Sequence, residues 1–445
     1  VDPALVDLIG EAARLGDKSV IMAALEDLHP ADASDALEQL EPELFGDVVA
    51  LLGADLSSDI LIELRNEYRN DAVDLLPDTS IAEALRALDS DDAAAILEGL
   101  SEGRRTDVLE TLEAGDRTAL ERAMDFDEET AGRLMQREFV AAPEFWTVGH
   151  TVDHARASGD DLPDHFFEIY VVDPGFQVKG AVPLATLLRT PRDVRLAEIM
   201  NDIEAEITTD MDQEEVAFLF QKYHLASAPV VDEGRRITGM ITVDDMVDVI
   251  QSENTEDLLA LSGVSKADGS DTVWDSVKAR APWLGINLGT AFLASAIISI
   301  FEPALDRLVA LAILMPVVAA LGGNAGSQAL TVAVRAIAER EMEGAATRRA
   351  VRREILTGIA NGVIFAVGVG LVTMFWFRNA VLAFTIAVAI LVTFTLGCLF
   401  GVLVPIVLKR LGADPAVASS VFVLTTTDIV AFASFLGLAT LILIH

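Results

Sequence analysis

Basic residues and cysteine are both scarce in this chain of 445 residues. It holds 32 lysines and arginines against 70 aspartates and glutamates, a net charge of −38. So acidic a surface repels nucleic-acid phosphates, which excludes nucleic acid as a partner and makes cations the expected ligands. The single cysteine, Cys398, lies in an apolar run, which excludes a disulfide framework and a zinc site built from cysteines.

Motifs of the common enzyme classes are missing too. None of the six histidines stands in a His-Glu-x-x-His metal motif, and neither a nucleophile elbow nor a Walker loop occurs. The first residues lack the basic region and apolar core of a secretory signal. We therefore expect no enzymatic activity and no catalytic residue.

The acidic charge is confined to one part of the chain. Residues 1–277 carry 20 basic and 62 acidic side chains, whereas residues 278–445 carry 12 and 8. The second part holds five apolar runs long enough to cross a bilayer as helices. They lie near 283–301, 308–338, 355–377, 380–408 and 415–444. The sequence therefore predicts an acidic soluble half followed by a five-span membrane half.

Positive charges gather in the connections on one side of the expected spans. They are Lys278, Arg280, Arg340, Arg348, Arg349, Arg352, Arg353, Lys409 and Arg410. The connections on the other side carry only Arg307 and Arg378. Because basic residues stay on the cytoplasmic side, the acidic half is expected in the cytoplasm and His445 outside.

One carboxylate interrupts the fifth span. Asp428 follows three threonines in the middle of an apolar run. An ionisable group at that depth is costly unless it meets water, a cation or a partner, so such residues usually mark a transport path. The structural alternative is a protonated Asp428 that hydrogen-bonds a neighbouring helix.

The second span contains Met315-Pro-Val-Val-Ala-Ala-Leu-Gly-Gly-Asn-Ala-Gly-Ser-Gln328. Pro316 removes a backbone donor and the glycines loosen the helix, so we expect irregular backbone with carbonyl oxygens free to bind a cation. Those oxygens and Asn324 are hard ligands, suited to Mg2+ or Ca2+. The alternative is close helix packing through Gly322 and Gly326, which have Gly-x-x-x-Gly spacing.

A repeat of 12 residues covers residues 28–124. Leucine recurs at 28, 40, 52, 64, 76, 88, 100 and 112, and Met124 completes the series. In the first seven repeats the eighth and ninth residues after each leucine are also apolar, and turn residues lie between. Each repeat therefore predicts one short helix and a turn, stacked into a superhelix. Its acidic turns are either simply solvated or contribute to cation sites.

From about residue 131 to 252 the pattern changes to strands and helices in two similar copies. Residues 168–184 read as strand, turn and strand before a short helix, and residues 228–247 repeat that order. An amphipathic helix precedes each strand pair. Beyond them, Asp245 and Asp248, then Glu253 and Asp257, are spaced to share helix faces. Such carboxylates repel unless a cation bridges them, and the alternative is a solvated acidic face.

Four motifs in these segments resemble those of the MgtE family of magnesium channels. They are Thr130-Ala-Gly-Arg-Leu-Met135, Pro229-Val-Val-Asp…Thr-Val-Asp-Asp245, Gly322-Gly-Asn-Ala-Gly-Ser-Gln328 and Asp414-Pro-Ala…Thr-Thr-Asp428. The resemblance implies a multidomain membrane protein: an all-α superhelical repeat domain, an α/β tandem pair of CBS domains, a connecting plug helix and five transmembrane helices. The implied bounds are 1–130, 131–252 (131–195 and 196–252), 253–277 and 278–445.

The resemblance also implies the function, uptake of Mg2+ across the inner membrane through a pore on the axis of a homodimer. The implied pore residues are Asp428, which binds the hydrated ion, with Val317, Ala320 and Asn324, and the motif glycines Gly322, Gly323 and Gly326. Mg2+ bound to the cytoplasmic half would close the pore. The implied regulatory residues are Asp91, Asp212, Glu214, Asp245, Asp248, Glu253, Glu256 and Asp257, with Asp414 as a peripheral metal candidate.

Some features stay open. Tyr223-His224 stands where many relatives of the family have an acidic residue, which puts one sensor site in doubt. ATP is a candidate ligand of the CBS pair, with nothing in the sequence to settle it. A coupled transporter driven by protons or sodium, with Asp428 as the titrating group, is the alternative to a channel, although such a protein usually has further intramembrane charges.

Overall fold

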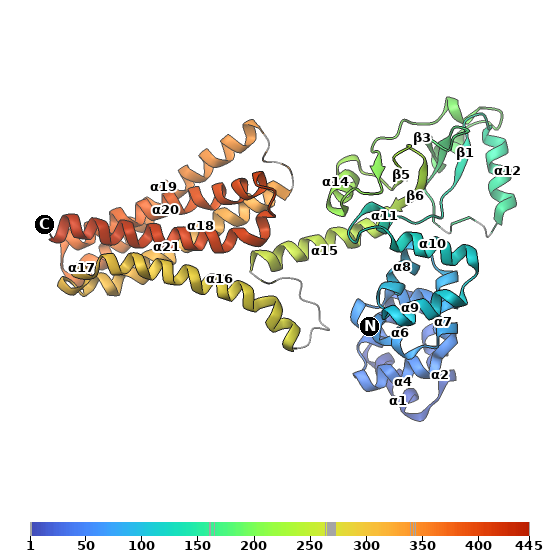
Figure 1. Cartoon of the computed structure of the whole chain (residues 1–445), viewed down its shortest axis with the longest axis horizontal. Helices are drawn as coiled ribbons and strands as arrows, with labels where there is room; N and C mark the ends of the chain where they lie inside the picture. The colour runs from blue at the N-terminus through green and yellow to red at the C-terminus, as the bar shows by residue number, and fades with distance from the viewer. Residues whose placement is uncertain are drawn as a thin grey trace. The chain divides into compact units, whose positions relative to one another are not determined.

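We analysed a computed structural model of the chain that describes residues 2–159, 162–163, 165–262, 264, 273–338, 340, 342 and 344–444. The chain divides into two compact units, Val1–Gln251 and Ser252–His445. Figure 1 shows the all-helical start of the chain, the two small sheets that follow and the long helices of the second unit.

The repeat region folds as predicted, with about one helix for each 12 residues. Two helices, α1 (Pro3–Leu15) and α2 (Lys18–Glu26), precede the repeats. The repeats form α3 (Pro30–Glu38), α4 (Pro42–Leu52), α5 (Ser58–Glu63), α6 (Asn66–Leu75), α7 (Asp78–Ala87), α8 (Ser90–Glu98), α9 (Glu102–Thr111) and α10 (Ala114–Met124), with a 3-10 turn η1 (Gly53–Asp55). Apart from α5, each helix from α3 to α10 begins two residues after a repeat leucine or its equivalent.

Stacking across two repeats builds the superhelix. Helices α3, α5, α7 and α9 pack in one row, and α4, α6, α8 and α10 pack in a second row. The apolar pairs of each repeat fill the core between the rows, so that Leu37, Val49 and Leu97 are fully buried. Each helix is too short to be stable alone, and the continuous core supplies what local propensity cannot.

The next segment forms two three-stranded mixed sheets of the same topology. The first has β1 (Ala141–Pro143), β2 (Glu168–Val172) and β3 (Val178–Pro183), and the second has β4 (Ile207–Thr208), β5 (Ser227–Val231) and β6 (Ile237–Thr242). In each, the first pairing is parallel and the second antiparallel. The helices are α11 (Ala131–Leu134), α12 (Val148–Ser158), α13 (Leu184–Arg189), a 3-10 turn η3 (Leu196–Glu198) and α14 (Gln213–Tyr223). The predicted duplication is confirmed.

The two halves of this pair exchange segments. Gln136 pairs with Met240 in the second sheet, and Asn201 pairs with Ala181 in the first. Glycine permits both crossings, because a Cβ on Gly239 would lie 2.6 Å from the Gln136 carbonyl oxygen and one on Gly180 would lie 2.4 Å from that of Asn201. The halves are thus interlocked.

One helix continues from the last strand into the second unit. Helix α15 runs from Val243 to Leu261, and α16 begins at Val273. The expected connector 253–277 therefore covers the second half of α15 and the start of α16; residues 263 and 265–272 lie outside the described residues. Ala260 is buried with Leu330 and Ala416 of the membrane unit.

Five helices of the second unit are long and apolar enough to cross a membrane, as predicted. They are α16 (Val273–Ile300), α18 (Ala310–Ala338), α19 (Ala345–Phe377), α20 (Ala380–Arg410) and α21 (Pro415–Ala439), with the short α17 (Glu302–Arg307) and a final π-turn η4 (Thr440–Ile444). Helix α20 packs against α18, α19 and α21. It is the centre of this unit.

Helix α18 is continuous through Pro316 and the glycines, so the expectation of irregular backbone there is wrong. The glycines serve close packing instead. A Cβ on Gly322 would lie 2.3 Å from Cγ2 of Thr393, and one on Gly326 would lie 2.8 Å from Cγ2 of Thr427. In α20, a Cβ on Gly401 would lie 2.5 Å from the Gly326 carbonyl oxygen. Packing from α20 and α21 thus holds the loosened sequence in a helix.

Candidate functional site

Asp428 lies in the middle of α21, and its side chain is half-buried. The described part of the chain offers it neither a hydrogen-bond partner nor an ion-pair partner. The three preceding threonines bond back to their own helix, as Thr427 Oγ1 does to the Leu424 carbonyl oxygen at 2.8 Å. The alternative of an Asp428 satisfied by a neighbouring helix therefore finds no support within this unit, which leaves the carboxylate for water, a cation or another subunit.

One face of α18 carries the other expected pore residues. Val317, Ala320 and Asn324 are exposed and spaced three and four residues apart, and Gln328 continues the row. The opposite side holds the buried glycines, and Gly326 touches Thr427, the residue before Asp428. The carbonyl groups of this segment remain within a helix. Asn324 and Gln328 are polar groups in mid-span, where lipid cannot solvate them.

A first cluster of regulatory candidates is formed by the initial turns of two helices. Asp91 and Asp92 begin α8, and Asp245 begins α15. Burial raises the pKa of Asp91 well above its usual range, and the charge of Asp245 raises it further. Burial likewise raises the pKa of Asp245 to about 7 and that of Asp92 to about 6. These carboxylates are held together against their mutual repulsion.

Hydrogen bonds hold the backbone of this cluster in place. Thr242 Oγ1 donates to Asp245 Oδ2 at 2.7 Å, and the Glu138 carboxylate accepts from the Ser90 N–H at 3.1 Å and from its hydroxyl at 2.9 Å. Asp91 Oδ1 is buried and has no hydrogen-bond partner among the described residues. A buried acceptor without a donor is costly, and a proton, a water molecule or a cation at this oxygen would offset that cost.

A second cluster lies within the membrane unit, at the end of the helix that enters it. Burial raises the pKa of Asp257 on α15, and the charges of Asp414, Glu253 and Glu256 raise it further. Asp414 is the N-cap of α21, and its Oδ1 accepts from the Ala416 N–H at 2.7 Å. The same α21 carries Asp428, so this cluster lies at the start of the helix that bears the candidate pore residue.

The remaining predicted residues are more exposed. Asp212 is the N-cap of α14 and accepts from the Glu214 N–H at 2.8 Å, while Asp248 lies on an exposed face of α15. Across the described residues, the structure brings no three carboxylate, histidine or cysteine side chains close enough to hold a bare metal ion. Mg2+ dehydrates reluctantly and keeps several waters, so a looser pair of carboxylates still suits the hydrated ion.

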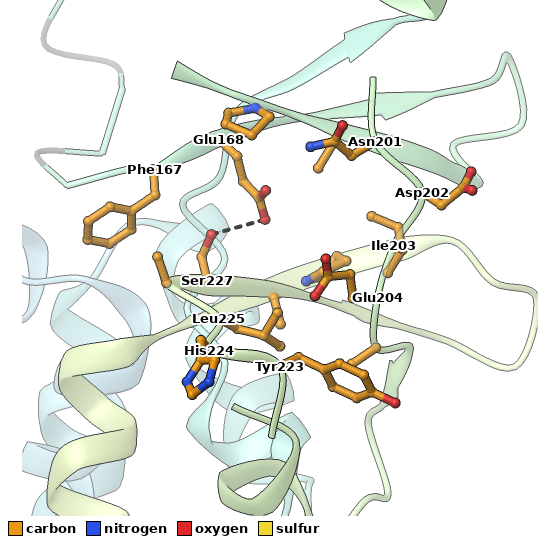
Figure 2. A pocket seen from close by; sticks show the side chains of 16 residues that line it. Phe167, Glu168, Asn201, Asp202, Ile203, Glu204, Tyr223, His224, Leu225 and Ser227 are labelled. Atoms are coloured by element: carbon orange, nitrogen blue, oxygen red, sulfur yellow. Dashed lines mark hydrogen bonds between the residues drawn. The ribbon is translucent and has the colours of Figure 1, made fainter. Parts of the chain in front are cut away.

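A pocket of about 260 Å³ lies between the halves of the strand-containing pair, as Figure 2 shows. Glu168 and Glu204 point into it, whereas Asp202 is turned away. Ser227 Oγ donates to Glu168 at 3.2 Å, and burial raises the pKa of that carboxyl. His224, in the left-handed conformation that ends α14, forms part of the wall.

Sequence reasoning missed Asp92 and Asp244, which add negative charge to the first cluster, and the acids of the pocket. For Asp92 a signal existed, because it directly follows the candidate Asp91 in the acidic turn Asp89-Ser-Asp-Asp92. For Glu168 and Glu204 no spacing rule applies, since they are 36 positions apart and meet only through the exchanged segments.

Together, five helices long and apolar enough to cross a membrane, a carboxylate in the middle of one of them and an acidic first unit define the class: a multi-pass membrane transporter of divalent cations. The chain belongs to the MgtE family of magnesium transporters. Residues 315–438 match the family described as MgtE, divalent cation transporter, residues 28–129 match the MgtE intracellular N domain, and residues 196–252 match the CBS domain. The N-terminal domain is therefore intracellular, the cargo is Mg2+, and the family is not one of enzymes.

Two relatives show how far the similarity extends. The magnesium transporter MgtE of Thermus thermophilus is 35% identical over 72% of this chain and 71% of its own length. That of Bacillus subtilis is 32% identical over 71% of this chain and 70% of its own length. The crystal structure of the cytosolic domain of the Mg2+ channel MgtE in complex with ATP covers 55% of this chain and 99% of that domain, at 32% identity and a TM-score of 0.51.

Proposed function

We propose that the chain forms a homodimeric Mg2+ channel in which Asp428 binds the hydrated ion. The observation that carries this proposal is the carboxylate of Asp428, which lies in the middle of α21 and has no partner in the described chain. It directly follows Thr427, the residue of α21 that packs against Gly326 of α18. Hydrated Mg2+ suits a single carboxylate with nearby polar oxygens, because the ion keeps most of its waters. Val317, Ala320 and Asn324 would line the same path.

The exposed polar row of α18 supports a second copy. Asn324 and Gln328 cannot face lipid without cost, and among the described residues the packing on α18 leaves this face exposed and covers its glycine side. A partner that covers this face while leaving a water-filled path between two copies satisfies both groups. With the N-terminal domain inside, five crossings put the end of α21 outside; His445 itself lies outside the described residues. We place the protein in the cell inner membrane.

Mg2+ would close this channel by binding between the carboxylates of each of the two clusters. Without Mg2+, Asp91 and Asp245 repel each other, and so do Asp257 and Asp414. When Mg2+ occupies these clusters, the repulsion becomes attraction and α15 is fixed at both ends. Asp212, Glu214 and Asp248 are further sensor candidates. Since α15 enters the membrane unit beside the start of α21, its position bears on the pore helix.

ATP fits this chain's pocket poorly. Tyr223, Ile203 and Leu225 could hold a nucleoside, but the described lining residues include no lysine or arginine for the phosphates. Lys222 Nζ lies 4.9 Å from the centroid of the Tyr223 ring and is not part of the lining. Because Glu168 and Glu204 point inward and would repel a triphosphate, we assign ATP no part in gating.

Flux measurements on Asp428→Asn test the channel. In proteoliposomes the variant should lose at least 90% of Mg2+ influx. The control is Asp306→Asn, which neutralises an exposed aspartate of α17 and should leave Mg2+ influx unchanged. Influx through the unaltered protein should persist when proton and sodium gradients are dissipated. Asp428 is the single carboxylate in the middle of the spans, which favours a channel over a coupled transporter.

Two outcomes would contradict the proposal. Mg2+ influx that survives Asp428→Asn would remove Asp428 from the pore. Influx that stops whenever the proton or sodium gradient is dissipated would establish coupled transport instead, with Asp428 as its titrating group.

A further inference from the structure

Four arginines crowd the first three turns of α19. They are Arg348, Arg349, Arg352 and Arg353, and all four are exposed. An open hollow of about 460 Å³ is lined by Arg349, Arg352, Arg353, Leu356, Thr357 and Ala360. The pore and the two carboxylate clusters use none of these residues.

The positive charge of this hollow is poorly compensated by the protein. Arg353 Nε pairs with Glu354 Oε1 at 3.4 Å, whereas Arg348, Arg349 and Arg352 form no ion pair within the described residues. The first turns of a helix carry a partial positive charge, so cations there are destabilising. An anion is therefore the ligand that this end of α19 favours.

The length of α19 sets the depth of the arginines. The helix has 33 residues. Its uncharged part, from Ile355 to Phe377, rises roughly 34 Å at about 1.5 Å per residue, which matches a hydrocarbon core of about 30 Å. Arg349, Arg352 and Arg353 then stand about 5–10 Å beyond Leu356, at the level of the phospholipid headgroups.

Below the arginines the same face of α19 is apolar and exposed. Leu356 is 55% exposed and Ile364 is 65% exposed, and Val363 and Val367 continue the strip. The opposite face is buried against α20 through small residues such as Gly358 and Gly362. Figure 1 shows the N-terminal end of α19 standing clear of α20 and α21. Cationic groups above an apolar strip match a phosphate above its acyl chains.

We propose that Arg349, Arg352 and Arg353 bind the phosphate of an anionic phospholipid from the cytoplasmic leaflet, whose acyl chain lies along Leu356, Ala360 and Ile364. Arginine suits this task, because its guanidinium group can donate two hydrogen bonds to one phosphate. A basic site at the cytoplasmic end of a transmembrane helix is the usual setting for such headgroups. The site fixes the start of α19 at the membrane surface.

Native mass spectrometry of the full-length protein, released from membranes of phosphatidylglycerol and phosphatidylcholine, tests this site. The unaltered protein should retain phosphatidylglycerol selectively. Since each arginine near the surface contributes roughly a fivefold preference, Arg349→Gln with Arg352→Gln should reduce the selectivity about 30-fold. Arg349→Lys with Arg352→Lys should stay within about fivefold of the unaltered protein. Lys409→Gln with Arg410→Gln removes two exposed charges from the same membrane side and should change nothing.

Four results would overturn the proposal. Unchanged selectivity in the double glutamine variant would place the lipid elsewhere, and an equal loss in the lysine variant would show that charge is not the determinant. Displacement of the lipid by 10 mM inorganic phosphate would make this a site for free phosphate. If the glutamine variant kept its lipids but changed the Mg2+-dependent protease protection of residues 1–251, the arginines would bind the acidic half instead.

Discussion

Removing one charge from the Asp91–Asp245 cluster should stabilise the α8 and α15 helices in part as bound Mg2+ would. Burial raises the pKa of Asp245 from 3.8 to about 7, and the charges of Asp244 and Asp92 contribute to this rise. Because the folded protein holds this proton more tightly than the unfolded chain, the associated stability is present at low pH and is lost as the pH rises from about 4 to 7. A shift of about three pH units corresponds to roughly 4 kcal/mol, and relaxation reduces it to about 1–3 kcal/mol at pH 8. Asp245→Asn removes the cost of holding a buried charge beside Asp244 and Asp92, and its amide oxygen still accepts a hydrogen bond from Thr242.

Hydrogen exchange of the α8 and α15 amides, in the full chain at pH 8, measures this local stability. Without Mg2+, Asp245→Asn should exchange roughly 5- to 150-fold more slowly than the unaltered protein, and added Mg2+ should slow it little further. Lowering the pH to 5 should protect the unaltered protein in the same way, after correction for intrinsic exchange rates. Asp35→Asn, an exposed charge on α3, is the matched control. Exchange in Asp245→Asn as fast as in the unaltered protein would refute the reasoning that the buried charge of Asp245 destabilises these two helices.

Two further predictions concern packing and the pocket. Gly401→Ala should lower the stability of the membrane unit by about 1–3 kcal/mol, because its Cβ would meet the Gly326 carbonyl oxygen at 2.5 Å. Gly368→Ala, whose Cβ would meet no described atom within 4 Å, should cause no loss of stability in thermal unfolding. Glu204→Gln should strengthen ATP binding about fivefold in calorimetry, because it removes a negative charge that points into the pocket. Asp202→Asn, at a side chain that is turned away from the pocket, should change the affinity less. Equal affinity of the unaltered protein and both variants would show that the carboxylates do not oppose ATP.

Most of the fold could be predicted because its signals are periodic. The leucine repeat gives the spacing of the helices, and residues such as Val49 and Leu97 fill the core at the expected positions. Five apolar runs predict five spans by length alone. The duplicated strand pairs were visible in the same way, down to the aspartates Asp173 and Asp232, each of which caps the turn of its hairpin. A periodic pattern predicts secondary structure without any knowledge of tertiary contacts.

The behaviour of Pro316 and Gly322 could not be predicted, because it depends on neighbours far along the chain. Proline and glycine weaken an isolated helix, and on that ground we expected open backbone. The side chain of Thr393 fills the space beside Gly322 and keeps α18 helical. The spacing of Gly322 and Gly326 did predict packing, so both interpretations were present in the sequence and tertiary contacts decided between them.

The candidate sites depend even more on such contacts. Asp91 and Asp245 are 154 positions apart, and each lies in the first turn of its helix, where the helix dipole favours a negative charge. The helix dipole stabilises each carboxylate within its own helix. The cost arises because α8 packs near α15, which brings the two negative charges close together. Mg2+ can shift α15 only if it binds one position of the helix more tightly than another, and relief of this repulsion would supply that difference. Repulsion in the Mg2+-free state therefore sets the range over which Mg2+ could shift α15.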